Sequence, residues 1–172
     1  MKLKKLALTA IAIITITATG TCFAITKEDL NAGGIYLGQS VENVIAQYGQ
    51  PTNEELVAGG GATHVLCYKK DNIPTIEVYT SKHTKQVIYF NITGENIATK
   101  AGVSVGSSLT DIKNAYGAPT NEGLIKPTNA APFYSIQYLL DKDSYNQYYL
   151  RFELQNNKVT KIYIGEEPKF MP

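Results

Sequence analysis

The sequence contains no tryptophan, only two cysteines and two histidines, and no apolar run long enough to cross a bilayer. Cys22 lies in an N-terminal segment that has the features of a leader, so a mature chain would keep Cys67 alone. One thiol cannot form an internal disulfide. Two histidines and one cysteine also provide few groups for a metal centre. Stability must therefore come from packing, for which a chain with 12 tyrosines and many isoleucines and valines is suited.

The first 24 residues have the pattern of a cleaved secretory leader. Three lysines precede an apolar and threonine-rich run of 14 residues, and Cys22-Phe23-Ala24 has the small-x-small character of a cleavage site. Spanning a bilayer takes roughly 20 apolar residues. We therefore expect a signal peptide over 1–24 and no membrane span after cleavage. The exported product would start at Ile25 and be periplasmic, on the cell surface or secreted.

The charge balance excludes one class of partner. The leader holds three of the 16 Lys and Arg residues and none of the 15 acidic residues, which leaves a mature net charge of about −2. A protein that binds a phosphate backbone usually presents a basic surface. Nucleic acid is therefore not an expected partner.

One stretch of the chain occurs twice, with an offset of 68 residues. Residues 34–54 and 102–122 share nine identities in 21 positions: two glycines, a serine, a Tyr-Gly pair and a Pro-Thr-Asn-Glu run. A fixed internal period predicts a repeat architecture. We therefore expect two units, 25–91 and 92–172. In each, a serine N-cap, an apolar face at helical spacing and a terminal Tyr-Gly predict a helix.

Each unit is expected to contain a second helix and three strands. Short segments that begin at Thr26 and Thr93 resemble capped helix starts. The strand-like runs, divided by short polar turns that favour hairpins, are about 63–70, 74–80, 86–92, 133–140, 146–154 and 158–164. The predicted fold class is α+β. It has two tandem units, each of two helices and a three-stranded antiparallel sheet, with the sheets joined or adjacent and the helices on one face.

Alternation of period two divides the strand residues between two faces. One set is apolar and is predicted to face the helices; it includes Ile88, Phe90, Phe152 and Ile164. The opposite face would combine tyrosines with charged and amide groups. Its members are Glu77, Tyr79, Tyr89, Gln137, Tyr149, Arg151, Glu153, Lys161 and Tyr163.

The sequence offers few groups for catalysis. His64 and Cys67 are three apart, which on a strand places them on opposite faces, so they would not share a metal or form a nucleophilic pair. His83 falls in a polar turn. The run Asp141–Asn146 begins like a calcium loop but lacks its glycine and its final glutamate, and a hairpin turn fits it better. The triple glycine at 59–61 lacks the Lys-Ser or Lys-Thr of a phosphate loop. We therefore expect no enzyme, no cofactor and no metal site.

The tyrosines have two interpretations, and the sequence leaves both open. Tyrosine provides a large rigid contact area with a polar tip, which suits recognition of a protein partner. Tyrosines also stabilise sheets through cross-strand pairs. Tyr79, Tyr89, Tyr149 and Tyr163 are candidates for contact with a partner, although cross-strand stabilisation is the favoured interpretation of any single one of them.

The order of these motifs resembles two families. A Gly-x-Ser start, a short helix, Tyr-Gly-x-Pro and a β-meander resemble the SmpA/OmlA (BamE-like) outer-membrane assembly lipoproteins. Two such units in tandem look like the β-lactamase inhibitory protein (BLIP-like) family, whose joined sheet forms a concave protein-binding face. The resemblance implies an exported, non-enzymatic protein-binding module of the cell envelope or secretome. An envelope assembly or structural component is the alternative, and a hydrolase is a third hypothesis.

Overall fold

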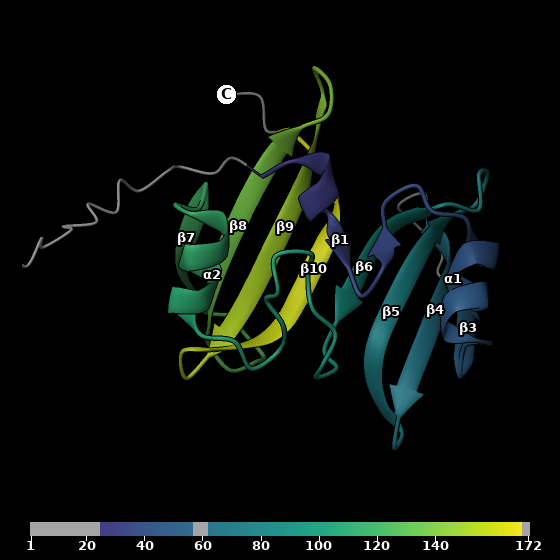
Figure 1. The fold of residues 1–172 in the computed structure, drawn as a ribbon, viewed down its shortest axis with the longest axis horizontal. Helices are drawn as coiled ribbons and strands as arrows, with labels where there is room; N and C mark the ends of the chain where they lie inside the picture. The colour runs from purple at the N-terminus through teal and green to yellow at the C-terminus, as the bar shows by residue number, and fades with distance from the viewer. Residues whose placement is uncertain (1–24, 57–61, 170–172) are drawn as a thin grey trace, which may run out of the picture.

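A computed structural model of the chain describes residues 25–56 and 62–169. The predicted signal peptide and the triple glycine lie outside these residues. One antiparallel sheet of eight strands dominates the described structure, in the order β3-β4-β5-β6-β10-β9-β8-β7 (Figure 1). The strands are β3 (Asn53–Leu56), β4 (Ala62–Lys70), β5 (Ile73–Ser81), β6 (Val87–Ile92), β7 (Asn121–Ile125), β8 (Phe133–Asp141), β9 (Asn146–Gln155) and β10 (Lys158–Pro168).

The strand order shows that the second half of the chain repeats the first. In the first half, β3 lies at one edge of the sheet and β4, β5 and β6 follow in order toward the centre. In the second half, β7 lies at the opposite edge and β8, β9 and β10 follow toward the centre in the same way. The halves meet at the centre, where β6 pairs with β10 in antiparallel register and Phe90 lies opposite Ile164. Both side chains are fully buried. The two units therefore share one sheet and one apolar core.

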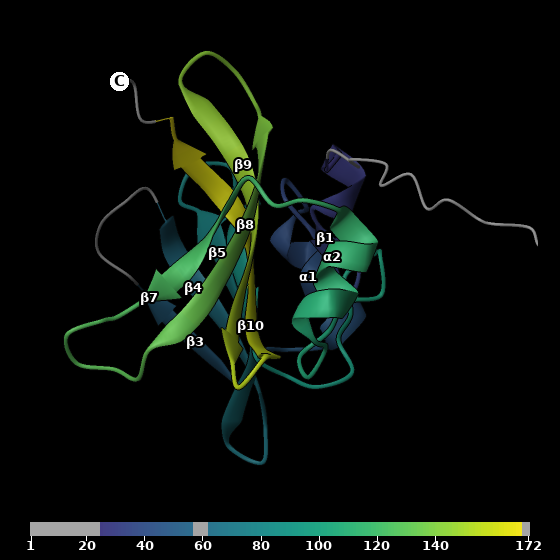
Figure 2. The same cartoon turned by 90° about the vertical axis from the view of Figure 1, so that its left-hand side faces the viewer.

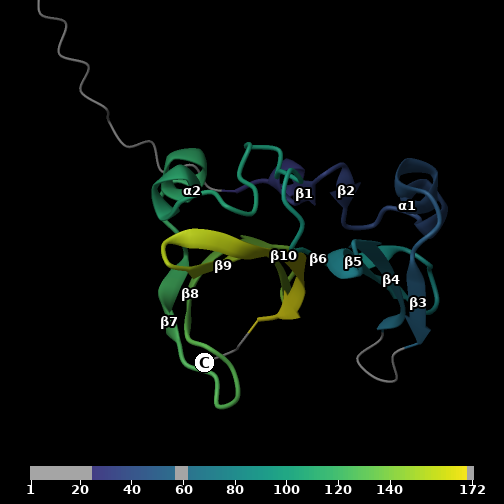
Figure 3. The ribbon, with the colours of Figure 1, turned by 90° about the horizontal axis from the view of Figure 1, so that it is seen from below.

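All described helices cover the same face of the sheet. α1 (Val41–Tyr48), α2 (Leu109–Tyr116) and the small hairpin of β1 (Asn31–Ala32) and β2 (Ile35–Tyr36) form one layer above it (Figures 2 and 3). The core lies between this layer and the sheet. Phe90 and Phe152 are its largest fully buried side chains, and each such burial stabilises the fold by about 1.5–3 kcal/mol.

The predicted central helices are present, and their ends are formed by the residues that the repeat conserves. Ser40 and Ser108 are the N-caps, and each side chain accepts a hydrogen bond from the backbone N–H three residues later. Gly49 and Gly117 follow the last turns with φ of 80° and 73°, which side chains disfavour. The identical glycines are therefore required by the backbone.

The predicted fold class is wrong in its helices. Each unit has one α-helix, because the segment after Thr26 forms only a 3-10 turn, Lys27–Asp29, and the segment after Thr93 forms no helix. The N–H groups of Thr93 and Gly94 both donate to the carbonyl oxygen of Thr75 on β5. Asn96 has φ of 67°, outside the right-handed helical region. These bonds and this dihedral angle fix the segment as a turn.

The prediction is also wrong in the number of strands, since each unit contributes four to the sheet. The additional strands, β3 and β7, begin in the repeated Pro-Thr-Asn-Glu run, where the sequence analysis predicts no strand. Thr52 and Thr120 attach these strands to their neighbours: their N–H groups donate to the carbonyl oxygens of Cys67 and Gln137. The molecule is therefore mostly sheet, not two helix-helix-three-strand units.

One predicted core position is displaced by a bulge. Ile88 was assigned to the helix-facing set, but the pairing of β5 with β6 shifts register between Tyr79 and Thr80, so that Thr80 lies opposite Val87. Val87 is 1% exposed, whereas Ile88 is only partly buried. The extra residue of a β-bulge changes the face on which side chains lie.

No helix within 25–56 and 62–169 is long and apolar enough to cross a membrane.

Candidate functional site

The nine residues predicted for the second face of the sheet lie together. We call the side of the sheet opposite α1, α2 and the β1–β2 hairpin the open face. Direct strand pairs place these nine residues in three adjacent rows that run across the strands of both units. Their strands are β5, β6, β8, β9 and β10. The chain thus brings residues from positions 77 to 163 onto one surface.

One row crosses all eight strands without interruption. Its eight members are consecutive cross-strand partners, and four of them are predicted residues. They are Asn53, Cys67, Glu77, Asn91, Tyr163, Arg151, Gln137 and Asn121. The next row contains Tyr79, Tyr89, Gly165 and Tyr149. Lys161 and Glu153 are partners in the third.

Tyr163 and Arg151 form the centre of the open face. The guanidinium carbon of Arg151 lies 4.3 Å from the centroid of the Tyr163 ring, and Lys161 Nζ lies 4.8 Å from it. Arg151 is also 5.7 Å from the ring of Tyr149. Cations at these distances are attracted to the ring faces. No carboxylate in 25–56 or 62–169 forms an ion pair with Arg151, and its Nε is buried without a hydrogen-bond partner there.

Gly165 allows two tyrosines to approach the sheet closely. A Cβ at this position would lie 2.7 Å from Tyr149 Oη and 2.8 Å from a ring carbon of Tyr89. The two rings therefore fold over the glycine from the strands on either side of β10. Tyr79 packs on Tyr89 with a centroid separation of 4.7 Å, and Tyr163 stacks on the other side of Tyr89 at 6.1 Å. The tyrosines of the open face are one connected aromatic cluster.

Amide side chains hold the carboxylates of the open face. Asn91 Nδ2 donates to Glu77 Oε2 at 2.8 Å, and Gln137 and Gln147 both donate to Glu167 Oε1 at 3.1 Å. The sequence analysis missed Asn91, Gln147 and Glu167. Extending the alternation Tyr89–Asn91 and Tyr163–Gly165–Glu167 would have found two of them. Glu167 lies beyond the expected end of its strand at 164, whereas β10 continues to Pro168; Asn91 lies within the predicted run 86–92 and was omitted from the face.

The predicted residues are less accessible than a protruding contact surface would be. Eight of the nine are partly buried, and Tyr149 is only 9% exposed. These side chains are partly buried because the tyrosine rings pack on each other, on Gly165 and on Arg151. Tyr149 therefore supports its neighbours, and the other eight residues retain part of their accessible area on the open face.

The tyrosines of the open face are neutral hydrogen-bonding groups. Burial raises the pKa of Tyr149 to about 12. Burial also raises the pKa of Tyr89, and in Tyr163 burial and the nearby carboxylate of Glu153 raise the pKa together. Phenols with raised pKa values stay protonated at neutral pH and carry no charge. The charges on this part of the face are therefore those of Arg151, Lys161 and the glutamates.

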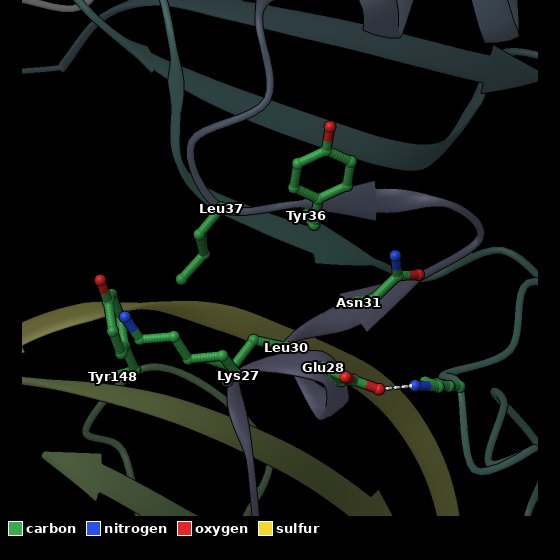
Figure 4. A pocket seen from close by; sticks show the side chains of 8 residues that line it. Lys27, Glu28, Leu30, Asn31, Tyr36, Leu37 and Tyr148 are labelled. Carbon is green, nitrogen blue, oxygen red and sulfur yellow. Dashed lines mark hydrogen bonds and ion pairs between the residues drawn. The ribbon is translucent and has the colours of Figure 1, made fainter. Parts of the chain in front are cut away.

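Two hollows flank the centre of the molecule. One, of about 430 Å³, lies on the open face, and its lining includes Tyr79, Tyr89, Tyr149 and Glu167. The other, of about 460 Å³, lies on the helix side between the β1–β2 hairpin and β9 (Figure 4). There Lys27 Nζ lies 5.9 Å from the centroid of Tyr148, and Glu28 is paired with Lys100. The sequence analysis did not foresee the helix-side hollow.

The candidates for catalysis lie apart from one another. Cys67 is buried on the open side of β4, and burial and the nearby Glu77 and Glu55 raise its pKa, so its thiol stays protonated. His64 is exposed on the same strand, and His83 is exposed in the turn between β5 and β6. No group of three or more His, Cys, Asp or Glu residues within the described ranges could hold a metal ion.

The run that begins like a calcium loop is a hairpin turn. It joins β8 to β9, and Asp143 Oδ1 accepts hydrogen bonds from the N–H groups of Tyr145 at 2.7 Å and Asn146 at 2.8 Å. These bonds lower the pKa of Asp143. The carboxylate therefore stabilises the turn itself.

Comparisons with known proteins identify the fold and no family. No protein-family model matches the chain, and no curated protein matches its sequence. The structure is similar to that of an extracellular protein containing a SCP domain from Bacillus anthracis, with a TM-score of 0.53 and 11% identity. The match covers 100% of this chain but 57% of that protein. The uncharacterized protein yfeY from Escherichia coli matches at 13% identity over 80% of this chain and 97% of its own, with a TM-score of 0.47.

At these identities the comparisons concern the fold alone. The comparisons show neither the β-lactamase inhibitory protein family nor the outer-membrane assembly lipoprotein family. The resemblance to those two families therefore stays a prediction.

Proposed function

We propose that the protein is an exported, non-enzymatic binding module that contacts a protein partner through the open face of its sheet. The observation that carries the proposal is the continuous row of polar and aromatic side chains across all eight strands, with Arg151 stacked on Tyr163 at its centre. Tyrosine and arginine are the residue types that most often dominate protein interfaces. The leader-like pattern of residues 1–24 supports export.

The way Arg151 is held favours recognition of a partner. Its guanidinium is held over two aromatic rings, with no carboxylate among the described residues to neutralise it. A side chain that is already ordered loses little conformational entropy when it binds. Arginine donates five N–H bonds in a planar fork that matches a carboxylate. An acidic side chain of the partner is the natural complement to Arg151 and Lys161.

The proposal is tested by capturing partners from the native envelope and medium with matched variants. Arg151→Gln combined with Tyr163→Ser removes the centre of the open face. Tyr145→Ser is the control, because Tyr145 is 67% exposed but lies in the β8–β9 turn. We expect the double variant to lose a captured protein that both the wild type and the control retain. Capture that survives the double variant, in a protein shown by circular dichroism to be folded, contradicts the proposal.

A second measurement locates the contact. Amide hydrogen exchange of the protein with its captured partner should slow in β9 and β10, where Arg151 and Tyr163 lie. Protection restricted to α1, α2 and the β1–β2 hairpin would assign binding to the helix side, including the hollow beside Tyr148, and would remove the open face from consideration.

A further inference from the structure

The two ends of the sheet differ although they come from equivalent parts of the repeat. β3 forms one edge and β7 the other, and no strand within the described residues pairs on the outer side of either. An unpaired strand edge exposes backbone N–H and C=O groups that can pair with another strand. Leu56 on β3 and Leu124 on β7 occupy matching positions 68 residues apart, and they are 79% and 56% exposed.

β3 carries two adjacent carboxylates that oppose pairing, and β7 keeps only the first of them, since Glu122 is the equivalent of Glu54. Glu54 and Glu55 are consecutive and exposed on β3. At the position of Glu55, β7 has Gly123, around which there is open space because no heavy atom lies within 4 Å of a Cβ built there. The next residue after Leu124 is Ile125, which is 45% exposed. Charged residues on edge strands are a usual protection against association, and β7 has an apolar pair instead.

The sequence of β7 is complementary to itself when it is read in the antiparallel direction. With Leu124 opposite Leu124 of a second copy, Ile125 would face the open space at Gly123. Glu122, whose Oε2 is paired with Lys113 Nζ at 2.8 Å, would also face Lys126, which is exposed and forms no ion pair within the described residues. In this register Leu124 pairs with Leu124, which is an apolar pair. Ile125 pairs with Gly123, a large residue with a small one, and Glu122 pairs with Lys126, an acidic residue with a basic one. Such cross-strand pairs stabilise a sheet, whereas like charges directly opposite destabilise it.

We propose that β7 pairs with β7 of a second copy of this chain, in the register centred on Leu124. A two-fold axis perpendicular to the sheet would relate the copies and keep both open faces on the same side. The fold already uses this kind of pairing, because β6 and β10 join the two halves as antiparallel equivalents. A contact of this type is isologous and closes at two subunits. Pro127 limits the strand pairing to about five residues.

The association is expected to be weak. One strand pair buries less area than a standard stable interface, so we expect a dissociation constant of about 10–100 μM. The apolar hollow of about 510 Å³ beside β7, lined by Leu109, Leu124, Phe133 and Leu154 among others, adds apolar surface next to the seam. The dimer is independent of the proposed partner on the open face, and each can fail without the other.

Sedimentation velocity at rising protein concentration tests the association. We expect the weight-average sedimentation coefficient of the wild type to rise toward that of a dimer. Leu124→Lys should weaken the dimer by at least about tenfold, because the substitution is present twice in a two-fold contact. The matched control is Leu56→Lys on the opposite edge, which should leave the association unchanged. A monomer at all concentrations, or equal loss in both variants, overturns the proposal.

Single cysteines test the register. Leu124→Cys should form an intermolecular disulfide under mild oxidation, because residues directly opposite have Cβ atoms about 4.5–5.5 Å apart. Glu122→Cys alone should not, but its mixture with Lys126→Cys should. Cys67 is buried and does not compete. If Leu124→Cys stays reduced while β7 amides become protected only on addition of the captured partner, the edge binds a partner strand and the second copy is excluded.

Discussion

The phenol of Tyr138 donates a hydrogen bond of 3.0 Å to the carbonyl oxygen of Gly117, the residue that ends α2. Tyr68 makes the same bond, at 3.2 Å, to Gly49 at the end of α1. In each unit a tyrosine of the second strand after the helix, β4 or β8, thus satisfies a backbone acceptor at the helix end. These two contacts connect the repeated helix stop to the sheet.

Removing this hydroxyl should destabilise each unit to a similar degree. We expect Tyr138→Phe to lower the free energy of unfolding by about 1 kcal/mol, because the partly buried carbonyl of Gly117 loses its donor and the ring packing stays. Tyr68→Phe should cost a similar amount. The residues lie on β8 and β4, well apart in the sheet, so the double variant should show the sum of both effects. Urea unfolding measures all three, and unchanged midpoints would contradict the role of the bond.

Gly165 should tolerate no side chain. A methyl group there would lie 2.7 Å from Tyr149 Oη and 2.8 Å from Tyr89, so one or both rings must move. We expect Gly165→Ala to lower the free energy of unfolding by about 1–3 kcal/mol, the usual effect of overpacking. Gly123→Ala is the control, because it enters open space on β7, and it should change stability by less than about 0.5 kcal/mol. Equal effects of the two substitutions would show that the rings do not depend on Gly165.

The protein should lose stability steeply between pH 10 and pH 12. Burial raises the pKa of Tyr116, Tyr138 and Tyr149 to about 12 in the folded protein, against 10.0 for a free phenol. In this window the unfolded chain has lost these protons and the folded chain still holds them. Stability is therefore complete below pH 10 and falls as the pH rises toward the folded pKa values. Each such tyrosine contributes about 1.4 kcal/mol per pH unit.

Denaturant unfolding across this pH range, followed by circular dichroism, measures the slope. Tyr116→Phe removes one group, so its slope should be shallower by the contribution of one tyrosine. Substitution of Tyr145, which is 67% exposed, should leave the slope unchanged. A slope that does not respond to Tyr116→Phe would mean that this phenol ionises equally in the folded and the unfolded chain.

The thiol of Cys67 should be inert in the folded protein. It is 5% exposed, and burial together with the carboxylates of Glu77 and Glu55 raises its pKa, so little thiolate forms at neutral pH. We expect a thiol reagent such as 5,5′-dithiobis(2-nitrobenzoic acid) to label the native protein at least about 100-fold more slowly than the urea-unfolded chain. Rapid labelling without denaturant would show that β3 or β5 opens from β4.

Much of each unit could be predicted from local sequence. Residue type and spacing predict the Ser40 and Ser108 caps, the two helices that begin after these serines, and the six longest strands. The structure contains all of these. The strands β3 and β7 were missed because the Asn-Glu runs that start them contain few apolar residues. Their pairing is fixed by bonds from Thr52 and Thr120 to distant strands, which no local pattern contains.

Nine residues of the open face were predicted to share one face of the sheet, whereas Asn91, Gln147 and Glu167 and the arrangement of the side chains were not predicted. Alternation placed the nine residues on one face, and the strand pairs bring them into adjacent rows. The stacking of Arg151 on Tyr163 and the packing of two rings over Gly165 needed the register between β6, β9 and β10. Their role in binding a protein stays a prediction.

The sequence by itself determined the frame of this protein: two repeated units, with helix caps and stops at identical serines and glycines and apolar residues at helical or alternating spacing. These features act over one or two turns, so neighbouring residues suffice to specify them. Only the tertiary structure decided that β6 pairs with β10. That pairing places Phe90 opposite Ile164 and joins the two units in one eight-stranded sheet. The choice depends on apolar surfaces that become buried together only when distant segments meet.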